Sequence, residues 1–429
     1  MTLTARPGRP LNGEADVPGD KSCSHRALIL GAMAEGETRI IGLLESEDVL
    51  ATARAVETLG AKVDRRDNSW SVRGGAWRSH CAIDCGNSGT TARLLMGAVA
   101  GRPGVRVLFT GDGSLSARPM TRVTLPLQRM GAGVDGGNGL PITIQGSNLG
   151  GIEHRNLPAS AQVKSAILLA GLGTAASVEV LEPVPSRDHT EIMLGQFGCK
   201  VGVDDTPSGW AVSLGKARRL AGCQLNIAAD PSSAAFPLVA AAIVPGSDIL
   251  VRGMLVNPLR TGLYEVLEHM GADISVSNER IQSGEIVADV GLRHSVLQPC
   301  HVRAEQIPAM IDEIPALAVA CAFADGESVI EGLDELRVKE SDRLGAIVAG
   351  LTACGVSAVA NGDTLRIFGR SEVRGGASIA TRGDHRIAMA FLTLGLAAED
   401  AVEVDEAQMI GTSFPGFAET MRSLGADIQ

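Results

Sequence analysis

Aromatic residues are scarce in this sequence: Phe, Trp and Tyr together make up 3% of its 429 residues, and there is a single tyrosine. Hydrophobic residues as a whole make up 45% of the chain, which is ordinary for a globular protein. The core must therefore be built from Ala, Leu, Val and Ile, which suits closely packed helices. The length predicts two or three domains.

Long apolar runs are also missing, since no stretch reaches the roughly 18–20 apolar residues that span a bilayer. The segment Met1–Pro10 lacks the apolar core of a signal peptide. The eight cysteines are scattered singly apart from Cys81 and Cys85, and no His or Cys partners complete a zinc pattern. We therefore expect a cytoplasmic protein with reduced, mostly buried thiols and no membrane partner.

An excess of positive charge is absent too, because the net charge is −11. This balance argues against nucleic-acid binding and against an RNA-processing enzyme, but it leaves room for a local basic pocket. No Walker loop is present, and Gly111-x-Gly113 is too short to imply a nucleotide site. No His, Asp or Glu spacing suggests a metal, so we expect no metal and no cofactor.

Six glycines form an internal repeat. Each ends a helix-like segment and precedes a small residue and then Val or Ile, the copy at Gly355 being the most eroded. Glycine fits the left-handed residue that closes a helix because it has no Cβ to clash. Solenoid repeats of roughly 20–50 residues are too short for this spacing, which predicts six small α/β modules, three in each of two domains. The glycines are Gly60, Gly131, Gly198, Gly271, Gly355 and Gly425.

Each module also contains a helix that is apolar nearly all round, which is typical of a helix buried on every side. A β-rich run, a more polar helix ending at the glycine, and hairpin-like strands such as Trp70–Val72 and Ile142–Ile144 follow it. This order predicts buried parallel helices under sheets that face solvent. The expected buried helices are Ala27–Ala34, Ala92–Ala100, Ala166–Leu172, Ala234–Val244, Ala316–Ala324 and Ile387–Ala397.

The two ends of the chain complement each other. The last module ends at Gln429 directly after its glycine and lacks closing strands, whereas a spare strand, Gly13–Val17, precedes the first module. We infer that the N-terminal strand completes the C-terminal domain. We therefore expect a discontinuous domain of residues 1–19 and 229–429, and an inserted domain of residues 20–228.

Polar and basic residues directly precede the buried helices. Asp, Ser and Asn there are ordinary N-caps, but Lys and Arg oppose the positive end of the helix dipole. The positions of Lys21, Arg26 and Arg386 therefore indicate a site that needs positive potential. If the helices of each domain run the same way, their N-termini converge and hold anions. We expect these basic side chains to meet in one cleft between the domains.

Arg118, Arg187, Lys339 and Arg343 extend this pattern, although each could instead belong to a surface ion pair. Lys339 and Arg343 share a face if their segment is helical. Two carboxylates lie among these bases, and a buried acid among cations can exchange protons. They are Asp312, which could equally be a helix cap, and Glu340. His25, His189 and His385 could be core residues or could support the site.

These segments together resemble the 3-phosphoshikimate 1-carboxyvinyltransferase (EPSP synthase) family. The resemblance runs from Leu11 to Ile428 and is carried by Pro18–Arg26, Gly86–Thr90, Arg118–Met120, Arg337–Arg343 and Asp384–Arg386. It implies the two-domain enolpyruvyl transferase fold of six βαβαββ units. It also implies transfer of the enolpyruvyl group of phosphoenolpyruvate to the 5-hydroxyl of shikimate 3-phosphate, with release of phosphate, in aromatic amino acid biosynthesis. We expect a monomer that acts on these two small molecules.

The resemblance implies roles for individual residues. Asp312 would take the proton of the attacking hydroxyl, and Glu340 with Lys21 would handle the proton on the phosphoenolpyruvate methylene. Phosphoenolpyruvate would be held by Lys21, Gly89, Arg118, Gln162, Arg343 and Arg386. Shikimate 3-phosphate would be held by Lys21, Ser22, Arg26, Ser160, Ala161, Gln162, Arg187, Asp312 and Lys339.

Some positions depart from the better-known family pattern. His189 stands where many relatives have Tyr, Glu335 where many have Asn, and Thr412 where many have Lys. The loss of a cation at Thr412 predicts weaker phosphoenolpyruvate binding. Gly89 stands where relatives resistant to the herbicide glyphosate carry Ala, which predicts susceptibility.

Two other functions remain as alternatives. The sister enzyme acting on UDP-N-acetylglucosamine shares the fold, but it typically uses a Cys in the loop that here reads Gly113–Arg118, where no Cys is present. A non-catalytic repeat scaffold would explain the modules but not the cations at the helix starts.

Overall fold

The computed structural model describes residues 1–67 and 69–429. It divides into two compact units: unit 1 comprises Met1–Pro18, Ala228–Ile281 and Ile286–Gln429, and unit 2 comprises Gly19–Ile227 and Gln282–Glu285. Gly19 and Ala228 each lie one position across the domain boundaries expected from the sequence. Residues 282–285 were expected in the C-terminal domain but belong to unit 2. They go with unit 2 because Ser283 Oγ accepts from the Asn226 amide at 2.8 Å and Gln282 donates to the Asn226 carbonyl at 3.3 Å.

The described part of unit 2 contains three four-stranded sheets, with strand orders β14-β3-β5-β4, β6-β7-β9-β8 and β10-β11-β13-β12. Its helices are α1 Lys21–Met33, α2 Glu47–Leu59, α3 Gly89–Ala100, α4 Gly113–Ala117, α5 Thr121–Met130, α6 Ala161–Gly171 and α7 His189–Gln196. Its strands are β3 Glu37–Ile41, β4 Lys62–Arg66, β5 Ser69–Arg73, β6 Cys81–Asp84, β7 Arg106–Thr110, β8 Gly133–Gly136, β9 Ile142–Gln145, β10 Ile152–Arg155, β11 Val178–Glu182, β12 Val201–Thr206, β13 Gly209–Leu214 and β14 Gln224–Asn226.

Unit 1 also has three four-stranded sheets, with orders β16-β17-β15-β2, β18-β19-β21-β20 and β22-β23-β1-β24. Its helices are α8 Pro231–Ile243, α9 Gly262–His269, α10 Ile314–Ala322, α11 Arg343–Ala353, α12 His385–Gly395 and α13 Phe417–Ser423, with the 3₁₀ turns η1 Ala304–Ala309, η2 Asp334–Val338 and η3 Ala407–Thr412. Its strands are β1 Leu3–Arg6, β2 Asn12–Glu14, β15 Asp248–Leu255, β16 Asp273–Gln282, β17 Glu285–Arg293, β18 His301–Val302, β19 Gly326–Ile330, β20 Ser357–Asn361, β21 Thr364–Gly369, β22 Ser378–Ile379, β23 Val402–Val404 and β24 Asp427–Ile428.

The sheets repeat one pairing pattern. In the second module β6 pairs parallel with β7, β7 pairs antiparallel with β9, and β9 pairs antiparallel with β8. Together with α3 and α5, this arrangement is one βαβαββ module. The parallel edge strand of the first module is β14, from the end of the unit, and that of the fourth module is β2, from the N-terminus.

The N-terminal strands differ in bounds and pairing from the strand expected there. The expected strand Gly13–Val17 is instead β2 (Asn12–Glu14), which pairs with β15 of the fourth module. The strand that completes the sixth module is β1 (Leu3–Arg6), which pairs antiparallel with β23 and β24. The last module does have a closing strand, β24, after Gly425. The N-terminal strands β1 and β2 are too short to give a clear alternating pattern in the sequence.

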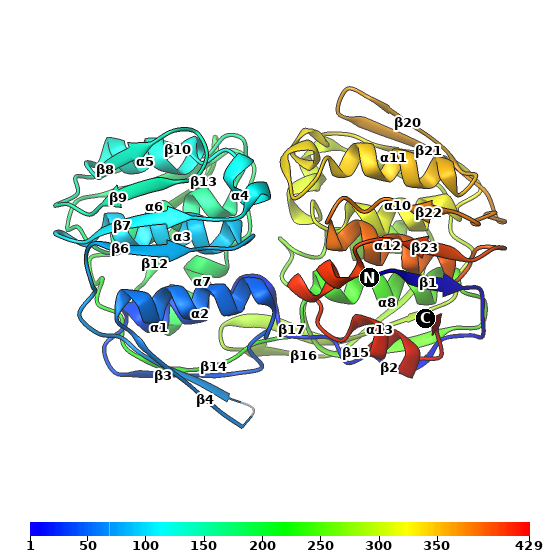
Figure 1. The fold of residues 1–429 in the computed structure, drawn as a ribbon, viewed down its shortest axis with the longest axis horizontal. Coiled ribbons are helices and arrows are strands. Elements are labelled where there is room, and N and C mark those ends of the chain that lie inside the picture. The colour runs from blue at the N-terminus through cyan, green and yellow to red at the C-terminus, as the bar shows by residue number, and fades with distance from the viewer. Residues whose placement is uncertain (68) are drawn as a thin grey trace. The chain divides into compact units, whose positions relative to one another are not determined.

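Six buried helices form the cores of the two units, as the apolar pattern predicts: α1, α3 and α6 in unit 2, and α8, α10 and α12 in unit 1. Figure 1 shows α8, α10 and α12 side by side, and all three pairs are in contact. The approach can be very close, since a Cβ on Gly97 of α3 would lie 2.2 Å from the Ala166 carbonyl oxygen of α6.

The six repeat glycines all have positive φ angles, between 84° and 112°. Gly60 and Gly131 are themselves the left-handed C-caps of α2 and α5. A side chain is strained in this conformation, so the glycine pattern has the physical origin that the sequence predicted.

Candidate functional site

The first turns of the buried helices in unit 2 lie together. Gln162 Nε2, at the start of α6, donates to Thr90 Oγ1, at the start of α3, at 2.9 Å. Asp20, Ser88 and Ser160 cap α1, α3 and α6 by accepting from backbone amides. Converging helix starts concentrate positive partial charge, so this end of the bundle suits anions.

Arg26 of α1 connects this helix with α6 and α7. Its Nε donates to Thr190 Oγ1 at 2.7 Å, and its Nη2 donates to Ser165 Oγ at 2.8 Å. Its Nη1 also reaches the carbonyl of Ser22 at 3.0 Å, and the side chain is buried. Burial lowers the pKa of Arg26. Lys21, one turn earlier on α1, forms an ion pair with Asp48 at 2.5 Å.

Arg118 and Gly89 lie close to each other. Arg118 Nη2 donates to Asn87 Oδ1 at 2.7 Å and to Ser114 Oγ at 3.2 Å, so the loop before α3 and the short helix α4 hold the guanidinium. A Cβ added to Gly89 would lie 2.9 Å from Arg93 Nη1 and 3.5 Å from Arg118 Nη1. The glycine therefore leaves room beside two guanidinium groups.

Arg93 belongs to this cluster, although the sequence analysis did not include it among the site residues. Its Nη1 donates to Gln162 Oε1 at 2.8 Å, and its Nη2 donates to the Pro119 carbonyl at 3.3 Å. Together with Thr90 it fixes both ends of the Gln162 amide. Its position one turn into α3, after the Gly86–Thr90 segment, was the signal in the sequence that could have identified it.

The segment that carries Arg187 is anchored by a buried ion pair. Lys164 Nζ lies 2.7 Å from Glu182 Oε2 and 2.7 Å from Glu191 Oε1, and it donates to the Ser186 carbonyl at 3.0 Å. Burial opposes the charge of Lys164, but Glu191 and Glu182 raise its pKa. Burial also raises the pKa of Glu191 despite Lys164. This network fixes the backbone next to Arg187, which is near enough to contribute to the lowered pKa of Arg26.

Unit 1 brings together the starts of its own buried helices. Ser232, in the first turn of α8, hydrogen-bonds to Glu313, the N-cap residue of α10. Arg386, in the first turn of α12, donates to the Asp312 carbonyl at 2.9 Å and lies 3.8 Å from Glu313 Oε1. Asp384 caps α12 by accepting from the Arg386 amide.

Asp312 is the centre of the cluster in unit 1. Its Oδ1 accepts from Lys339 Nζ at 3.3 Å and from Arg343 Nη1 at 3.3 Å. Asp312 lies two residues before α10, so the alternative that it caps this helix is wrong: Glu313 is the N-cap residue, and no side chain caps the helix there. The carboxylate is directed to cations instead of to the helix backbone.

Arg343 is held by three carboxylates. It donates to Asp384 Oδ2 at 2.8 Å, to Glu340 Oε2 at 2.6 Å and to Asp312 Oδ1 at 3.3 Å. Burial opposes its charge, but Asp384, Glu340 and Asp312 outweigh burial and raise the pKa of Arg343. The guanidinium is thus fixed in place and permanently charged.

The segment that carries Lys339 and Arg343 is not one helix. The turn η2 ends at Val338, and α11 starts at Arg343 because Asp342 caps it by accepting from the Gly345 amide. The condition under which Lys339 and Arg343 would share a helical face is therefore not met. They come together through Asp312, which accepts from both.

The three positions that depart from the family pattern lie in different surroundings. Thr412 is buried in η3 and donates to the Met409 carbonyl at 2.7 Å. His189 is buried in unit 2, where its Nδ1 lies 2.7 Å from Glu285 Oε1. Glu335 lies in η2 and is partly exposed.

Asp20, Cys23 and His189 bring a carboxylate, a thiol and an imidazole within 4.8 Å of one another. The sequence spacing gave no sign of this cluster. Burial is the main cause that lowers the pKa of the adjacent His25, and the positive charges of Lys21 and Arg26 lower it further. The same positive charges oppose the binding of a metal cation at this cluster. The cluster is better explained as polar packing at the start of α1, where Asp20 caps the helix.

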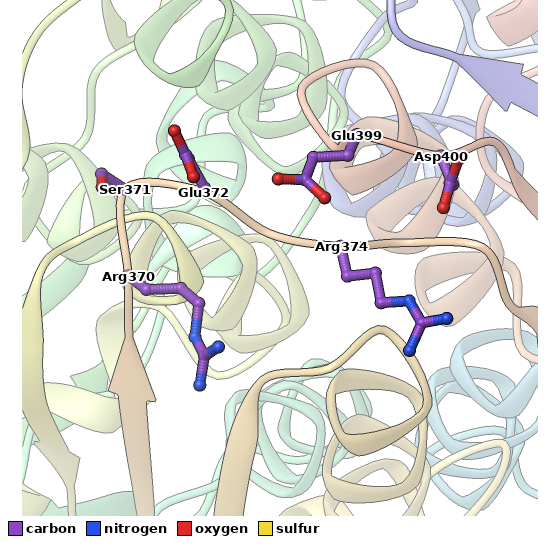
Figure 2. Close-up of a pocket in the computed structure, with 6 residues that line it drawn as sticks. All are labelled: Arg370, Ser371, Glu372, Arg374, Glu399 and Asp400. Carbon is purple, nitrogen blue, oxygen red and sulfur yellow. The ribbon is translucent and has the colours of Figure 1, made fainter.

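A surface depression of about 370 Å³ lies elsewhere in unit 1. It is lined by Arg370, Ser371, Glu372, Arg374, Glu399 and Asp400, none of which is a predicted site residue. In Figure 2 the arginine side chains extend on the opposite side of their segment from Glu372 and Glu399. Mixed charges of this kind do not form an anion site. Among the described residues, no helix has the length and apolar character that crossing a membrane requires.

Comparison with known proteins adds independent evidence. The family model for EPSP synthase (3-phosphoshikimate 1-carboxyvinyltransferase) matches residues 5–421. The chain belongs to the EPSP synthase family. A family member of this name from Phenylobacterium zucineum is 52% identical, covering 99% of this chain and 95% of its own. One from Caulobacter vibrioides is 51% identical, covering 99% and 98%.

Solved structures agree with this assignment. EPSP synthase from Acinetobacter baumannii aligns with a TM-score of 0.86 and 39% identity, covering 100% of this chain and 99% of its own. The enolpyruvyl transferase NikO from Streptomyces tendae aligns with a TM-score of 0.81 at 18% identity, which supports the fold alone. The predicted α/β enolpyruvyl transferase fold of six modules is thus confirmed.

Proposed function

We propose that this chain transfers the enolpyruvyl group of phosphoenolpyruvate to the 5-hydroxyl of shikimate 3-phosphate and releases phosphate. The observation that carries this proposal is membership of the EPSP synthase family over residues 5–421. The reaction places it in the shikimate pathway, which supplies aromatic amino acids.

The charged groups suit these substrates. Each substrate carries a phosphate and a carboxylate, and Lys and Arg offset their repulsion through charge-assisted hydrogen bonds. In unit 2 we assign shikimate 3-phosphate binding to the first turns of α1 and α6 and to the Arg187 segment, that is, to Lys21, Ser22, Arg26, Ser160, Ala161, Gln162 and Arg187. Lys21, Gly89, Arg118 and Gln162 would contact phosphoenolpyruvate. The convergence of α3 and α6 at Thr90 and Gln162 supports this assignment.

Unit 1 supplies two of the three proton-transfer groups in this proposal, Asp312 and Glu340, and unit 2 supplies Lys21. The substrate hydroxyl adds to C2 of phosphoenolpyruvate while C3 gains a proton, and the intermediate then loses phosphate and a proton. Asp312 accepts the hydroxyl proton, and Glu340 with Lys21 handles the proton at C3. Lys339 and Asp312 would also bind shikimate 3-phosphate. The hydrogen bonds of Lys339 and Arg343 to Asp312 support this role because they fix the carboxylate.

Arg343 and Arg386 would bind phosphoenolpyruvate. Arg343 already donates to three carboxylates, and in this proposal a substrate anion takes the place of one of them. Glu340 is the partner to exchange, because its side chain is 23% exposed whereas that of Asp384 is fully buried. Substrate binding would thereby release Glu340 for proton transfer. Fixed charges around the tetrahedral intermediate are then the main catalytic contribution.

The choice of acceptor tests this function. Purified protein is incubated with phosphoenolpyruvate and either shikimate 3-phosphate or UDP-N-acetylglucosamine, and released phosphate is measured. We expect release with shikimate 3-phosphate alone. Release only with the nucleotide sugar would assign the chain to the sister activity, and release with neither would support a non-catalytic scaffold.

We also propose that the protein acts as a monomer in the cytoplasm, without a cofactor or a nucleic-acid partner. All eight cysteines are free thiols, which suits a reducing compartment. Light scattering coupled to size-exclusion chromatography would give a mass near 44.4 kDa if the chain is monomeric.

A further inference from the structure

Two cysteines of unit 1 lie in contact although they are 21 positions apart in the sequence: Cys300 Sγ is 3.6 Å from Cys321 Sγ. Cys300 precedes β18 and is partly exposed, whereas Cys321 lies in the buried helix α10. The backbone of Cys300 is fixed, because its amide donates to Ser328 Oγ at 3.2 Å and its carbonyl accepts from the Val329 amide at 2.9 Å.

We propose that Cys300 and Cys321 are a redox modification site, at which a hydroperoxide converts the two thiols into a reversible disulfide. A disulfide bond is about 2.05 Å long, so the sulfur atoms must approach by about 1.5 Å. Small rotations of two side chains on fixed backbones can supply this movement. Disulfides in reducing compartments are typically transient or redox-sensing, which fits two free thiols that lie in contact.

The two thiols have different roles in this reaction. A hydrogen bond from Cys321, with a further contribution from Ser328, lowers the pKa of Cys300 against the effect of burial. The same contact with Cys300, followed by burial, raises the pKa of Cys321. The partly exposed thiol is therefore the one that meets the oxidant as a thiolate, and the buried thiol resolves the product.

The disulfide forms in two steps. The Cys300 thiolate attacks one oxygen of hydrogen peroxide, the O–O bond breaks, and Cys300 sulfenic acid and one water form after proton transfer. Cys321 sulfur then attacks Cys300 sulfur, the S–O bond breaks, and hydroxide leaves with the Cys321 proton as a second water. Two thiols lose two electrons in total, and one peroxide is reduced to two waters.

The disulfide would constrain the segment that carries the proposed base. The chain between the two cysteines contains η1 and Asp312, the proposed base. A covalent link between Cys300 and α10 closes this segment into a loop. Because catalysis is sensitive to displacements of about 1 Å, we expect the oxidised enzyme to be roughly tenfold or more slower. This consequence rests on the proposed function, whereas formation of the disulfide does not.

Peptide mapping tests the proposal directly. Full-length protein is treated with hydrogen peroxide, free thiols are alkylated, and trypsin digestion is done without reduction. Cleavage after Arg293, Arg303 and Arg337 separates His294–Arg303, whose cysteine is Cys300, from Ala304–Arg337, whose cysteine is Cys321. We expect these peptides joined, with two hydrogens fewer than their sum, and separated again by dithiothreitol. Recovery of both as separate alkylated peptides, or of Cys300 joined to a different cysteine, would overturn the proposal.

Variants separate the modification from its effect. Cys300→Ser should block both the link and the loss of phosphate release on oxidation, whereas Cys223→Ser, a matched control at a partly exposed thiol of unit 2, should behave as the wild type. A linked wild type that keeps full activity would overturn the regulatory effect. An untreated wild type without any phosphate release would count against the proposed function while leaving the peptide result unaffected.

Discussion

We propose that single residues determine how strongly the two clusters bind substrates, and Thr412 is one example. It lies buried in η3, where its hydroxyl donates to the Met409 carbonyl, at the position that carries Lys in many relatives. We propose that this uncharged residue leaves the phosphoenolpyruvate site with one cation fewer than in those relatives.

We predict that Thr412→Lys lowers the Michaelis constant for phosphoenolpyruvate by roughly tenfold, since a charged hydrogen bond contributes about 1.5–3 kcal/mol. The turnover number should stay within a factor of about three, because binding is strengthened equally in ground and transition states. Thr412→Met, which adds length without charge, is the control. Equal Michaelis constants for the wild type and the Lys variant would refute the role of this position.

Gly89 governs the space beside two guanidinium groups. A methyl group at this position would meet Arg93 Nη1 at 2.9 Å and Arg118 Nη1 at 3.5 Å. We predict that the wild type is sensitive to glyphosate and that Gly89→Ala raises the inhibition constant by about tenfold or more, since one methyl group can discriminate to this extent. Phosphoenolpyruvate is the shorter molecule and should lose less affinity. Gly195→Ala, where an added Cβ meets nothing within 4 Å, should leave inhibition unchanged.

His25 makes stability depend on pH. It is buried against Thr52 Oγ1 at 2.7 Å, and burial, Lys21 and Arg26 lower its pKa well below 6.5. The unfolded chain therefore binds a proton below about pH 6.5 that the folded chain refuses, so stability falls as the pH falls.

We predict that the wild type loses up to about 1.4 kcal/mol of unfolding free energy per pH unit below pH 6.5 through this residue. His25→Asn should remove this part of the dependence, which urea titrations at pH 7.5, 6.5 and 5.5 would measure. If the difference in stability between wild type and variant stays constant with pH, the assigned pKa shift is wrong.

At the scale of elements, apolar pattern and glycine position identified the six buried helices because burial on every side leaves a strong signal. The pattern was weaker for short strands: β1 has four residues and β24 has two. The break between η2 and α11 was also missed, because a polar segment such as Lys339–Arg343 is compatible with one helix or with two. Of the candidate site, the sequence identified the charged residues at helix starts but not their partners, such as Arg93 with Gln162, which depend on packing.

The strand β1 offers a test at this scale. Leu3 and Ala5 are buried, and the strand pairs with both β23 and β24, so it holds the sixth sheet together. We predict that Leu3→Ala lowers the unfolding free energy by about 2–4 kcal/mol. Thr4→Ala, on the more exposed side of the same strand, should cost less than about 1 kcal/mol. Equal effects of the two variants in urea titrations would show that β1 does not complete the sheet.

At the scale of the whole molecule, the chain is two units with the same internal design. In each unit the starts of buried helices carry polar and charged residues, and helix packing fixes these residues in place. We propose that the discontinuous arrangement, with Met1–Pro18 belonging to unit 1, makes both units unfold as one cooperative enzyme. The central claim is that one cluster from each unit acts in the same reaction.

Steady-state phosphate release with one variant from each unit tests this claim most directly. Lys21→Met removes a cation of unit 2 that we propose binds substrate, and Asp312→Asn removes the proposed base of unit 1 while keeping the side chain the same size. The account predicts that phosphate release requires both phosphoenolpyruvate and shikimate 3-phosphate, and that each variant lowers kcat/KM by about 10²-fold or more. Release without shikimate 3-phosphate, or an unchanged kcat/KM in either variant, would contradict it.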